Sequence, residues 1–600
     1  MKILAVPGCI QGLGTGHLQR MLALVFKLGS EAFIYLDKDN LKSRGTAAEV
    51  ISSLGYSNAD IKWIDSIDHR ERWDLIILDR RKTNLCEFRS YSKLGLVAAI
   101  DEGGEAREYL PYLIDILPGR EYSIKANITD IALLDLPDVE SSFRYPFKRV
   151  LISFGGEDPA NLSSSLLDSL LKSDLLHGKD INLVIGPLFK EKNWPDEIRL
   201  IRNCNDLRSI MADYDLIFTS YGLTCFEALA SGAAVILLNP SRYHQRLSRF
   251  LRIPEIGVGK PDKRKLMTLL SNPDSFEGLI EIKKRFFHQP RKALKDIIPT
   301  MKTIGNSICP ICNQEVNPVV ARFSSRTYFI CSGCGIYYLL SLSGEAKKYN
   351  ADYFNSEYRE QYGKTYLQDF FNIKAIAHRR LVKIKKILLL KERYNSTSFK
   401  KPKLLDVGCA YGPFLSAAAE QGFDALGLDI SQEAVAYVNR ELKLKAFQAD
   451  FEQSDNSVIQ PQSMDVLTMW FVIEHIQKLE AVLKRVNRLL KMGGAFAFST
   501  PNGSGISALT DLNDFLKAAP SDHFSIWRPA IVKKILDKYG LALKKIYITG
   551  HHPERFFRGG QKKKPGSFLA AKIRLFSKIA GLGDTFEAVA VKTRELSENE

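Results

Sequence analysis

The sequence predicts an α/β protein of about four domains, in which parallel sheets with crossover helices make up most of the chain. Apolar β-type runs alternate with helical patterns from the N-terminus, and this alternation starts again near residue 149. A third unit opens at residue 401 with a strand and a glycine-rich turn, and two Cys-x-x-Cys pairs precede it. Of the 600 residues, 45% are hydrophobic and 25% charged, which is typical of a globular chain and excludes a largely disordered one.

The first 300 residues predict two doubly wound units in succession. The β-type runs of the first unit are residues 2–6, 32–37, 73–80 and 96–101. Those of the second unit are residues 149–158, 181–187, 214–220 and 233–239. Strands that alternate with helices favour a parallel sheet. We therefore expect two Rossmann-like domains, at residues 1–145 and 146–290, with a cleft between them.

A glycine-rich turn follows the first strand, where "GLGTGHLQR" supplies Gly12, Gly14, Gly16, His17 and Arg20. Glycines let backbone amides approach a ligand, and a helix that begins near His17 directs its positive end at the same place. That end favours a neutral imidazole, which leaves a ring nitrogen able to accept a proton. The alternative is a histidine that only caps the helix.

A second glycine-rich turn, at Gly155 and Gly156, follows the first strand of the second unit. Pro159 suits the first turn of the helix that comes next. Such a turn is weak evidence by itself, because a tight connection that touches no phosphate has the same sequence.

Four stretches taken together resemble a known family: "GTGHLQR", "LDR" after an apolar strand, "GGEDPANLS", and "SYGLTCFEALASGAAVILLNPSRYHQ". Over roughly residues 1–255 the chain is similar to the UDP-sugar hydrolase of the pseudaminic acid pathway, which has the GT-B fold of nucleotide-sugar glycosyltransferases. The resemblance implies tandem Rossmann-like GT-B domains. It also implies that Gly16 and His17 lie at the anomeric carbon of the sugar, where His17 activates or positions water.

The same resemblance implies a nucleotide site formed by Gly155, Gly156 and residues 224–227. Within that stretch Thr224 would contact the nucleotide, and Glu227 would accept hydrogen bonds from the ribose hydroxyls. The alternative for Glu227 is an exposed carboxylate favoured by the helix dipole.

One departure from the family pattern concerns Gln245 in the substrate-binding stretch. Tyr243 and His244 precede Gln245 where the resemblance predicts an acidic residue and an asparagine. The choice of sugar therefore stays open, as does whether water or another acceptor attacks. A front half that only binds a nucleotide sugar is a further alternative.

Four of the nine cysteines predict a zinc ribbon at residues 307–342, after a linker at 291–306. Their spacing, C-x2-C-x18-C-x2-C, lies within the zinc range, and the ligands would be Cys309, Cys312, Cys331 and Cys334. The other five cysteines are scattered and make no disulfide framework. A closed four-thiolate site has no open coordination position, so the zinc would fold the segment and perform no chemistry. A ribbon without metal and a redox dithiol are the alternatives.

Charge is distributed unevenly along the chain. Residues 1–300 hold 41 Lys and Arg against 39 Asp and Glu, and the rest hold 84 − 41 = 43 against 68 − 39 = 29, so the halves carry +2 and +14. A basic second half suggests an anionic partner such as a nucleotide-linked sugar, an acidic glycan or nucleic acid, or else solvated basic helices. No signal peptide and no apolar run long enough to span a membrane are found, so a cytoplasmic protein is expected.

The stretch "KPKLLDVGCAYGPFLSAAAEQGFDALGLDIS" at residues 401–431 predicts a cofactor-binding unit. A strand delivers Asp406 and Gly408 into a tight turn, Ala410 and Gly412 follow, and the next strand ends in Asp429. An acidic residue at that position is placed to bind ribose hydroxyls. Ala410 stands where a dinucleotide fingerprint has glycine, so the turn differs from the pattern of hydride-transferring enzymes.

This turn closely resembles that of class I S-adenosylmethionine (SAM) methyltransferases, and the likeness continues through "MDVLTMWFVIEHI" and "LLKMGGAFAFSTPN". It implies SAM as cofactor, with Asp450 contacting the adenine amine. Residues 307–600 resemble zinc-ribbon methyltransferases, a group that includes sugar C-methyltransferases. We expect a helical cap at 343–400, where tyrosines line a lid or only contact one another, and a SAM-dependent methyltransferase domain at 401–600.

Placement of the acceptor accounts for most of the catalysis of methyl transfer, and a base is needed only where the acceptor must lose a proton. His475 follows Glu474 in the turn after the fourth strand, and "DHFSIW" would turn His523 toward substrate. These two histidines are the predicted catalytic residues, ahead of His551 and His552. A histidine that only packs against the cofactor is the alternative for His475.

The two halves together predict a bifunctional enzyme of nucleotide-sugar or surface-glycan biosynthesis. Its front half would hydrolyse or transfer a UDP-linked sugar, and its rear half would methylate a sugar or glycan with SAM. A zinc-ribbon RNA methyltransferase is the alternative, which salt-sensitive RNA binding would favour. The sequence leaves open the sugar, the methylated atom, the order of the two steps and the oligomeric state.

Overall fold

A computed structural model describes most of the chain in two compact units. The residues that it leaves undescribed are 9–15, 37–50, 53–56, 58–60, 65, 120–121, 123, 134–135, 137–142, 173–177, 187–188, 191, 203, 205, 288–293, 299–300, 302, 306, 343–357, 389–400, 454–458, 558–565 and 598–600. The front unit comprises Met1–Met301 with Arg322–Ser324, and the rear unit comprises Lys302–Ala321 with Ser325–Glu600. No helix among the described residues combines the length and the apolar composition that crossing a bilayer requires.

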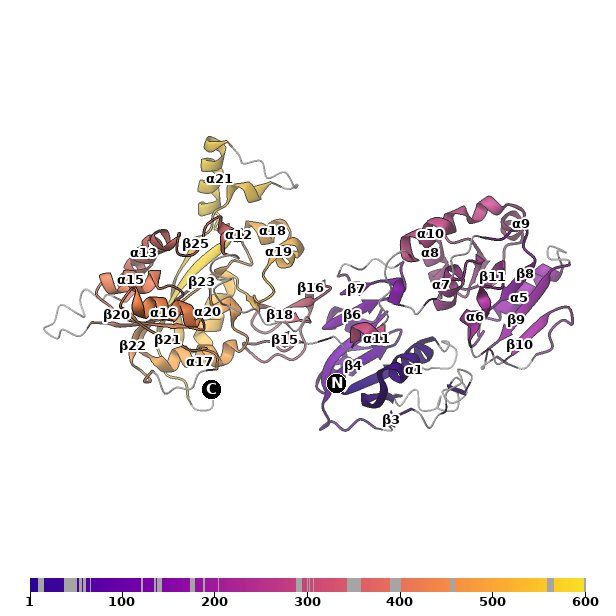
Figure 1. Cartoon of the computed structure of the whole chain (residues 1–600), viewed down its shortest axis with the longest axis horizontal. Coiled ribbons are helices and arrows are strands. Elements are labelled where there is room, and N and C mark those ends of the chain that lie inside the picture. Colours follow the sequence, from indigo (N-terminus) through magenta and orange to yellow (C-terminus); the bar gives the residue numbers. More distant parts are fainter. Residues whose placement is uncertain are drawn as a thin grey trace. The chain divides into compact units, whose positions relative to one another are not determined.

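The front unit begins with a seven-stranded sheet in the order β3-β2-β1-β4-β5-β6-β7, in which all neighbours are parallel (Figure 1). Its central strands are buried because they read as continuous apolar runs, as in "ILAVP" and "WDLIILD". The strands are β1 (Ile3–Pro7), β2 (Ala32–Tyr35), β3 (Trp63–Ile64), β4 (Trp73–Asp79), β5 (Gly95–Ile100), β6 (Tyr112–Asp115) and β7 (Ile128–Thr129). The helices described in this part are α1 (Gly16–Leu28) and α4 (Leu85–Ser92).

A second seven-stranded sheet follows in the order β10-β9-β8-β11-β12-β13-β14, and only β14 is antiparallel to its neighbour. The strands are β8 (Arg149–Ile152), β9 (Asp180–Ile185), β10 (Arg199–Arg202), β11 (Leu216–Thr219), β12 (Ala234–Asn239), β13 (Glu255–Val258) and β14 (Lys260–Pro261). The helices are α5 (Leu162–Leu171), α6 (Leu207–Met211), α7 (Leu223–Ala230), α8 (Arg242–Phe250), α9 (Lys263–Ser271) and α10 (Glu277–Phe287), and the chain then returns to the first sheet with α11 (Leu294–Ile297), which contacts α1. Two Rossmann-like sheets in succession are what the alternating pattern predicts.

A small antiparallel sheet carries the two cysteine pairs. Its order is β15-β18-β17-β16, and a strand from far along the chain, β24, pairs with β18. The strands are β15 (Ile304–Gly305), β16 (Val319–Phe323), β17 (Arg326–Ile330), β18 (Tyr337–Ser341) and β24 (Ser525–Ile526).

The large sheet of the rear unit has the order β21-β20-β19-β22-β23-β26-β25, with β26 antiparallel to both neighbours. The strands are β19 (Lys403–Val407), β20 (Asp424–Asp429), β21 (Lys445–Gln448), β22 (Met464–Trp470), β23 (Leu490–Pro501), β25 (Leu541–Thr549) and β26 (Thr585–Lys592). The helices are α12 (Tyr358–Tyr362), α13 (Phe370–Leu388), α15 (Pro413–Glu420), α16 (Gln432–Arg440), α17 (Leu479–Leu489), α18 (Ile506–Thr510), α19 (Leu512–Ala518), α20 (Pro529–Lys538) and α21 (Ser567–Ile579). The carboxyl ends of β19, β20 and β22 meet at one edge, where the site lies.

The core of the rear unit explains why α13 belongs to it. Leu381 and Ile384 of α13 are fully buried in one apolar cluster with Phe414 and Leu415 of α15 and Leu404 of β19. The cap predicted for residues 343–400 is described only from 358 to 388, so the tyrosines before residue 358 lie outside the described residues, as do Gly12 and Gly14. The finer domain boundaries within the two units stay predictions.

Candidate functional site

The glycine-rich turn after β19 adopts a backbone that its sequence explains. Gly408 and Gly412 have φ values of 71° and 78°, in the left-handed region. A Cβ atom on Gly408 would lie 2.4 Å from Val472 Cγ2, and Ala410 accepts a left-handed φ of 48° between the two glycines. The turn therefore keeps its backbone close to the segment that follows β22.

Two buried carboxylates lie at this turn: Asp406 on β19 and Asp429 at the end of β20. Asp429 accepts hydrogen bonds from the backbone amides of Ala410, at 2.8 Å, and Ser431, at 2.9 Å. Asp406 accepts a 2.6 Å hydrogen bond from the Thr468 hydroxyl. Burial raises the pKa of Asp429 and raises that of Asp406 to about 7, although hydrogen bonds act in the opposite direction. Both carboxylates are thus suited to a ligand that brings hydrogen-bond donors or positive charge.

The residues around this turn extend the site on two sides. Asp450 follows β21 and accepts a 2.8 Å hydrogen bond from the Glu452 amide, while the neighbouring Ala449 amide donates to the Asp429 carbonyl. On the other side, the Tyr366 ring lies 6.0 Å from that of Tyr411, the residue between Ala410 and Gly412. Tyr366 packs against the buried cluster of Ala410, Tyr411 and Ala434, so this tyrosine of the cap lies over the turn, and burial raises its pKa.

The structure brings His475 and His523 together, 48 residues apart in sequence, with ring centroids 4.6 Å apart at an interplanar angle of 89°. His475 Nδ1 donates to Asp522, whose carbonyl oxygen is 3.1 Å away and whose carboxylate Oδ2 is 3.2 Å away. His475 Nε2 is thereby left as the acceptor nitrogen. Burial lowers the pKa of His475, but the Asp522 hydrogen bond and the charges of Glu474 and Asp522 outweigh it and set the pKa above 6.5.

Glu474 beside His475 is fully buried, and burial raises its pKa to about 7 against the opposing effects of His475 and the Thr500 hydroxyl. The sequence alone does not identify Glu474 or Asp522 as site residues, whereas Tyr366 is one of the cap tyrosines for which a lid is an expectation. The dipeptides Glu474–His475 and Asp522–His523, each placed after a strand or before one, were the available signal. His551 bonds instead to Ser577 and His552 to Glu554, so both are engaged elsewhere.

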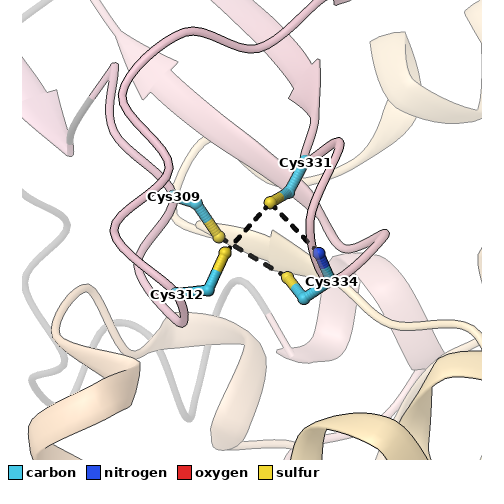
Figure 2. A group of neighbouring side chains, drawn as sticks. All are labelled: Cys309, Cys312, Cys331 and Cys334. Atoms are coloured by element: carbon cyan, nitrogen blue, oxygen red, sulfur yellow. Dashed lines mark hydrogen bonds between the residues drawn. The ribbon is translucent and has the colours of Figure 1, made fainter.

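Figure 2 shows the four cysteines of the small sheet converging on one point. Their sulfur atoms all lie within 4.8 Å of one another, and the closest pairs are Cys312 with Cys331 at 3.3 Å and Cys309 with Cys334 at 3.6 Å. A tetrahedral Zn²⁺ with bonds of about 2.3 Å separates its sulfurs by about 3.8 Å. The four residues therefore fit such an ion.

Both cysteine turns have the same backbone. The carbonyl of Cys309 accepts from the Asn313 amide and that of Cys331 accepts from the Gly335 amide. Asn313 and Gly335, each four residues after the first cysteine, have left-handed φ values of 59° and 81°. Two identical turns thus aim two thiols each at a common centre.

The small sheet also fixes the segment that carries His523, which lies just before β24. β18 pairs with β24, and the Leu339 amide donates to the Phe524 carbonyl, next to His523. The hydroxyl of Tyr539, the residue that follows α20, donates to the Ile311 carbonyl in the first cysteine turn at 2.6 Å. The cysteine turns are thereby tied to the segment that carries Asp522 and His523.

In the front unit, His17 on the first turn of α1 belongs to a buried charge network. Its Nδ1 lies 2.8 Å from Oδ1 of Asp79, the last residue of β4. Arg20, one turn on, donates to both Asp79 oxygens, at 2.6 and 2.7 Å, and to Asp101 at 2.8 Å. Arg20 and His17 hold the pKa of Asp79 below its usual value even though burial alone would raise it. A carboxylate on Nδ1 leaves Nε2 of His17 as the proton acceptor.

The predicted nucleotide residues are distributed around a second helix start. A Cβ atom on Gly16 would lie 3.4 Å from Leu223 Cδ1, so the first turns of α1 and α7 lie side by side, with Thr224 in that turn of α7. Gly155 has a φ of 89° and open space where a Cβ would stand, and Gly156 follows it. Backbone amides can approach a ligand at both places.

Two of the predicted front-unit ligands have protein partners. Glu227 Oε1 accepts a 2.8 Å hydrogen bond from Arg208 Nε, and the Gln245 amide donates to Glu255 Oε2 at 2.9 Å. His244 Nδ1 lies 2.8 Å from the Ser241 hydroxyl, and burial together with Arg81 lowers its pKa. Glu255 is also paired with Arg249 and Lys265, at 2.9 and 3.0 Å.

Comparison with known proteins shows what the rear unit is similar to. A family model described as a methyltransferase domain matches residues 376–546. A ubiquinone biosynthesis O-methyltransferase of Aliivibrio fischeri is 31% identical over 169 residues, which are 26% of this chain and 70% of that protein. A SAM-dependent methyltransferase structure from Archaeoglobus fulgidus has 17% identity and a TM-score of 0.29, covering 39% of this chain and 98% of that one. An uncharacterized protein of Methanocaldococcus jannaschii is 38% identical over 112 residues, and the chain spans only 22% of its length.

Proposed function

The chain belongs to the SAM-dependent methyltransferases, and from this premise we propose that it methylates a hydroxyl group of a nucleotide-linked sugar or glycan. The observation that carries the proposal is the meeting of the glycine turn, two buried carboxylates and the His475–Asp522 pair at one sheet edge. The relative's name, an O-methyltransferase, favours oxygen as the methylated atom. A sugar acceptor rests on the sequence resemblances of both halves.

The residues of the rear unit fit SAM, which when bound supplies the methyl group. Gly408, Ala410 and Gly412 would let the backbone approach it. Asp429 would accept from its ribose hydroxyls and Asp450 from its adenine amine. Burial disfavours the charged form of Asp429, so hydrogen-bond donors from a ligand would stabilise that carboxylate.

His475 would act as the general base of the rear unit. Its Nδ1 proton is held by Asp522, so Nε2 would take the proton from the acceptor hydroxyl. His523, edge to face with His475, would position the acceptor. Zn²⁺ held by the four cysteines would fold residues 307–342 and, through β18 and β24, hold His523 in place.

Removal of the Asp429 carboxylate tests the proposed SAM-binding site. Asp429→Ala is expected to weaken SAM binding about 10- to 100-fold, because hydrogen bonds to a charged group contribute about 1.5–3 kcal/mol. Isothermal titration calorimetry with SAM measures the change. Asp424→Ala, at the exposed other end of the same strand, is the matched control and should bind as the wild type does. An Asp429→Ala protein with wild-type affinity would refute the assignment.

For the front unit we propose a second activity, the hydrolysis or transfer of a UDP-linked sugar. The Asp79–His17 pair favours it, because a histidine held through Nδ1 at a helix start is placed to accept a proton from water. The nucleotide would be contacted by Gly155, Gly156 and Thr224. Glu227 and Gln245 would contact it too, either after their hydrogen bonds to Arg208 and Glu255 break or through those two partners.

Loss of the imidazole tests this second activity. His17→Asn should slow UDP release from a panel of UDP-linked sugars about 100-fold, the contribution expected of a general base, while UDP affinity persists. A coupled assay of free UDP gives the rate. His69→Asn, on an exposed loop, is the control. Unchanged UDP release by His17→Asn, or no release by the wild type, would make the front unit a binding module.

A further inference from the structure

The helix α21 turns its largest apolar side chains toward solvent. Phe568 and Ile579 are 74% and 79% exposed, and Leu569, Leu575 and Phe576 are about half exposed or more. At 100° per residue, Phe568, Leu575 and Ile579 lie on the side of the helix opposite Ser577, which is fully buried. A helix on the surface of a soluble domain normally has the reverse arrangement.

The helix is fixed to the domain along its inner edge. The Ser577 hydroxyl lies 2.8 Å from His551 Nδ1, and the Ser577 carbonyl accepts from the Leu582 amide at 2.9 Å. The Phe576 ring is 6.3 Å from that of Phe556. These contacts hold α21 where its outer face projects from the rear unit (Figure 1).

Basic side chains accompany this apolar face. The helix itself carries three exposed basic residues, Lys572, Arg574 and Lys578, and no acidic one. Lys572 Nζ lies 4.4 Å from the centre of the Phe568 ring, so its alkyl stem runs along the apolar face. Arg574 and Lys578 are exposed at the flank of the helix.

We propose that α21 binds the surface of an anionic lipid bilayer and lies in the plane of the interface. A basic helix with a projecting apolar face inserts its Phe, Leu and Ile side chains among the acyl chains while its cations meet the headgroup phosphates. The charge of the helix decides for this occupant, because an apolar protein groove or a second copy of this helix offers no anionic partner to Lys572, Arg574 and Lys578.

The C-terminal end of α21 connects this surface to the large sheet of the rear unit. The helix leads through residues 580–584 into β26, which begins at Thr585 opposite Pro501, the end of β23. That is the edge of the sheet at which Gly408 and Asp429 also lie. The C-terminal end of α21 therefore joins the domain at the edge that carries the site, whichever acceptor the site takes.

Co-sedimentation of the full chain with vesicles tests the proposal. We expect at least about tenfold stronger binding to phosphatidylcholine vesicles containing phosphatidylglycerol than to phosphatidylcholine alone, falling as salt rises. Phe568→Glu with Ile579→Glu should abolish binding, and Arg574→Glu with Lys578→Glu should abolish the preference for anionic vesicles. Phe250→Glu with Met267→Glu, exposed apolar residues on α8 and α9, is the control and should bind as the wild type does.

Three results would overturn the proposal. One is a wild-type chain that stays in the supernatant with both vesicle types. Another is a Phe568→Glu, Ile579→Glu variant that still binds, with calorimetry showing its SAM affinity and hence its fold intact. The third is a wild-type chain that binds no vesicles but forms a concentration-dependent dimer in analytical ultracentrifugation, while the Phe568→Glu, Ile579→Glu variant stays monomeric. That result would make α21 a self-association face.

Discussion

His475→Asn is expected to lower kcat for methylation of a sugar hydroxyl about 1000-fold, within the range of a lost general base. The reason is geometric: Asp522 holds the Nδ1 proton, so Nε2 is the nitrogen that would take the acceptor proton. Initial rates with labelled SAM measure the loss, and SAM affinity should stay close to wild type. His552→Asn, which removes an imidazole paired with Glu554 and not with Asp522, is the matched control.

The pH dependence makes this prediction specific. The pKa of His475 is raised above 6.5, so the imidazole is protonated and inactive as a base below that pKa. The wild-type rate should therefore rise with pH and level off above the folded-state pKa. Asp522→Asn removes the carboxylate that raises the pKa and should move the midpoint toward lower pH. A His475→Asn enzyme with the full rate and the same rising limb would contradict a base at this position.

Cys331→Ser is expected to remove the metal from the purified protein and to unfold residues 307–342. Structural Zn²⁺ binding contributes about 10–16 kcal/mol in zinc-finger peptides, which exceeds the stability of so small a sheet. Inductively coupled plasma mass spectrometry should find one zinc per wild-type chain and almost none in the variant. Limited proteolysis should then cleave within 307–342. Cys86→Ser, at an exposed cysteine of α4, should keep both the zinc and the resistance to proteolysis.

Loss of the metal should also lower the rate of methyl transfer. β18 pairs with β24, which begins two residues after His523, so an unfolded ribbon would release one wall of the proposed acceptor site. Methylation by Cys331→Ser should fall more than SAM binding does. A protein that is purified without zinc and resists proteolysis at 307–342 would contradict the structural role.

The sequence predicted the parts of the site that depend on local pattern. The turn at Asp406, Gly408 and Gly412 is a contiguous motif whose left-handed glycines are required by its geometry, and the four cysteines follow a fixed spacing. The four central strands of each front sheet were predicted because buried parallel strands are continuous apolar segments, whereas the short strands toward the sheet edges, such as β7 and β14, were not predicted. Such features need no knowledge of long-range contacts.

Residues that act through long-range pairs were not predictable in the same way. Asp79 lies 62 residues from His17, and nothing near "LDR" in sequence names its partner. Glu255 bonds to Gln245 only because α8 and β13 pack together, and Asp522 meets His475 only because the small sheet holds β24 in place. The outward apolar face of α21 was also hidden, since periodicity cannot say which side of a helix meets the domain.

Methylation of a sugar is the central claim, and incubation with methyl-labelled SAM tests it most directly. The full chain would be given a panel of UDP-linked sugars and, in parallel, ribosomal RNA, and the label would be located by chromatography and mass spectrometry. We predict incorporation into at least one UDP-linked sugar, at a hydroxyl oxygen, and none into RNA. Labelled RNA together with unlabelled sugars would contradict the account.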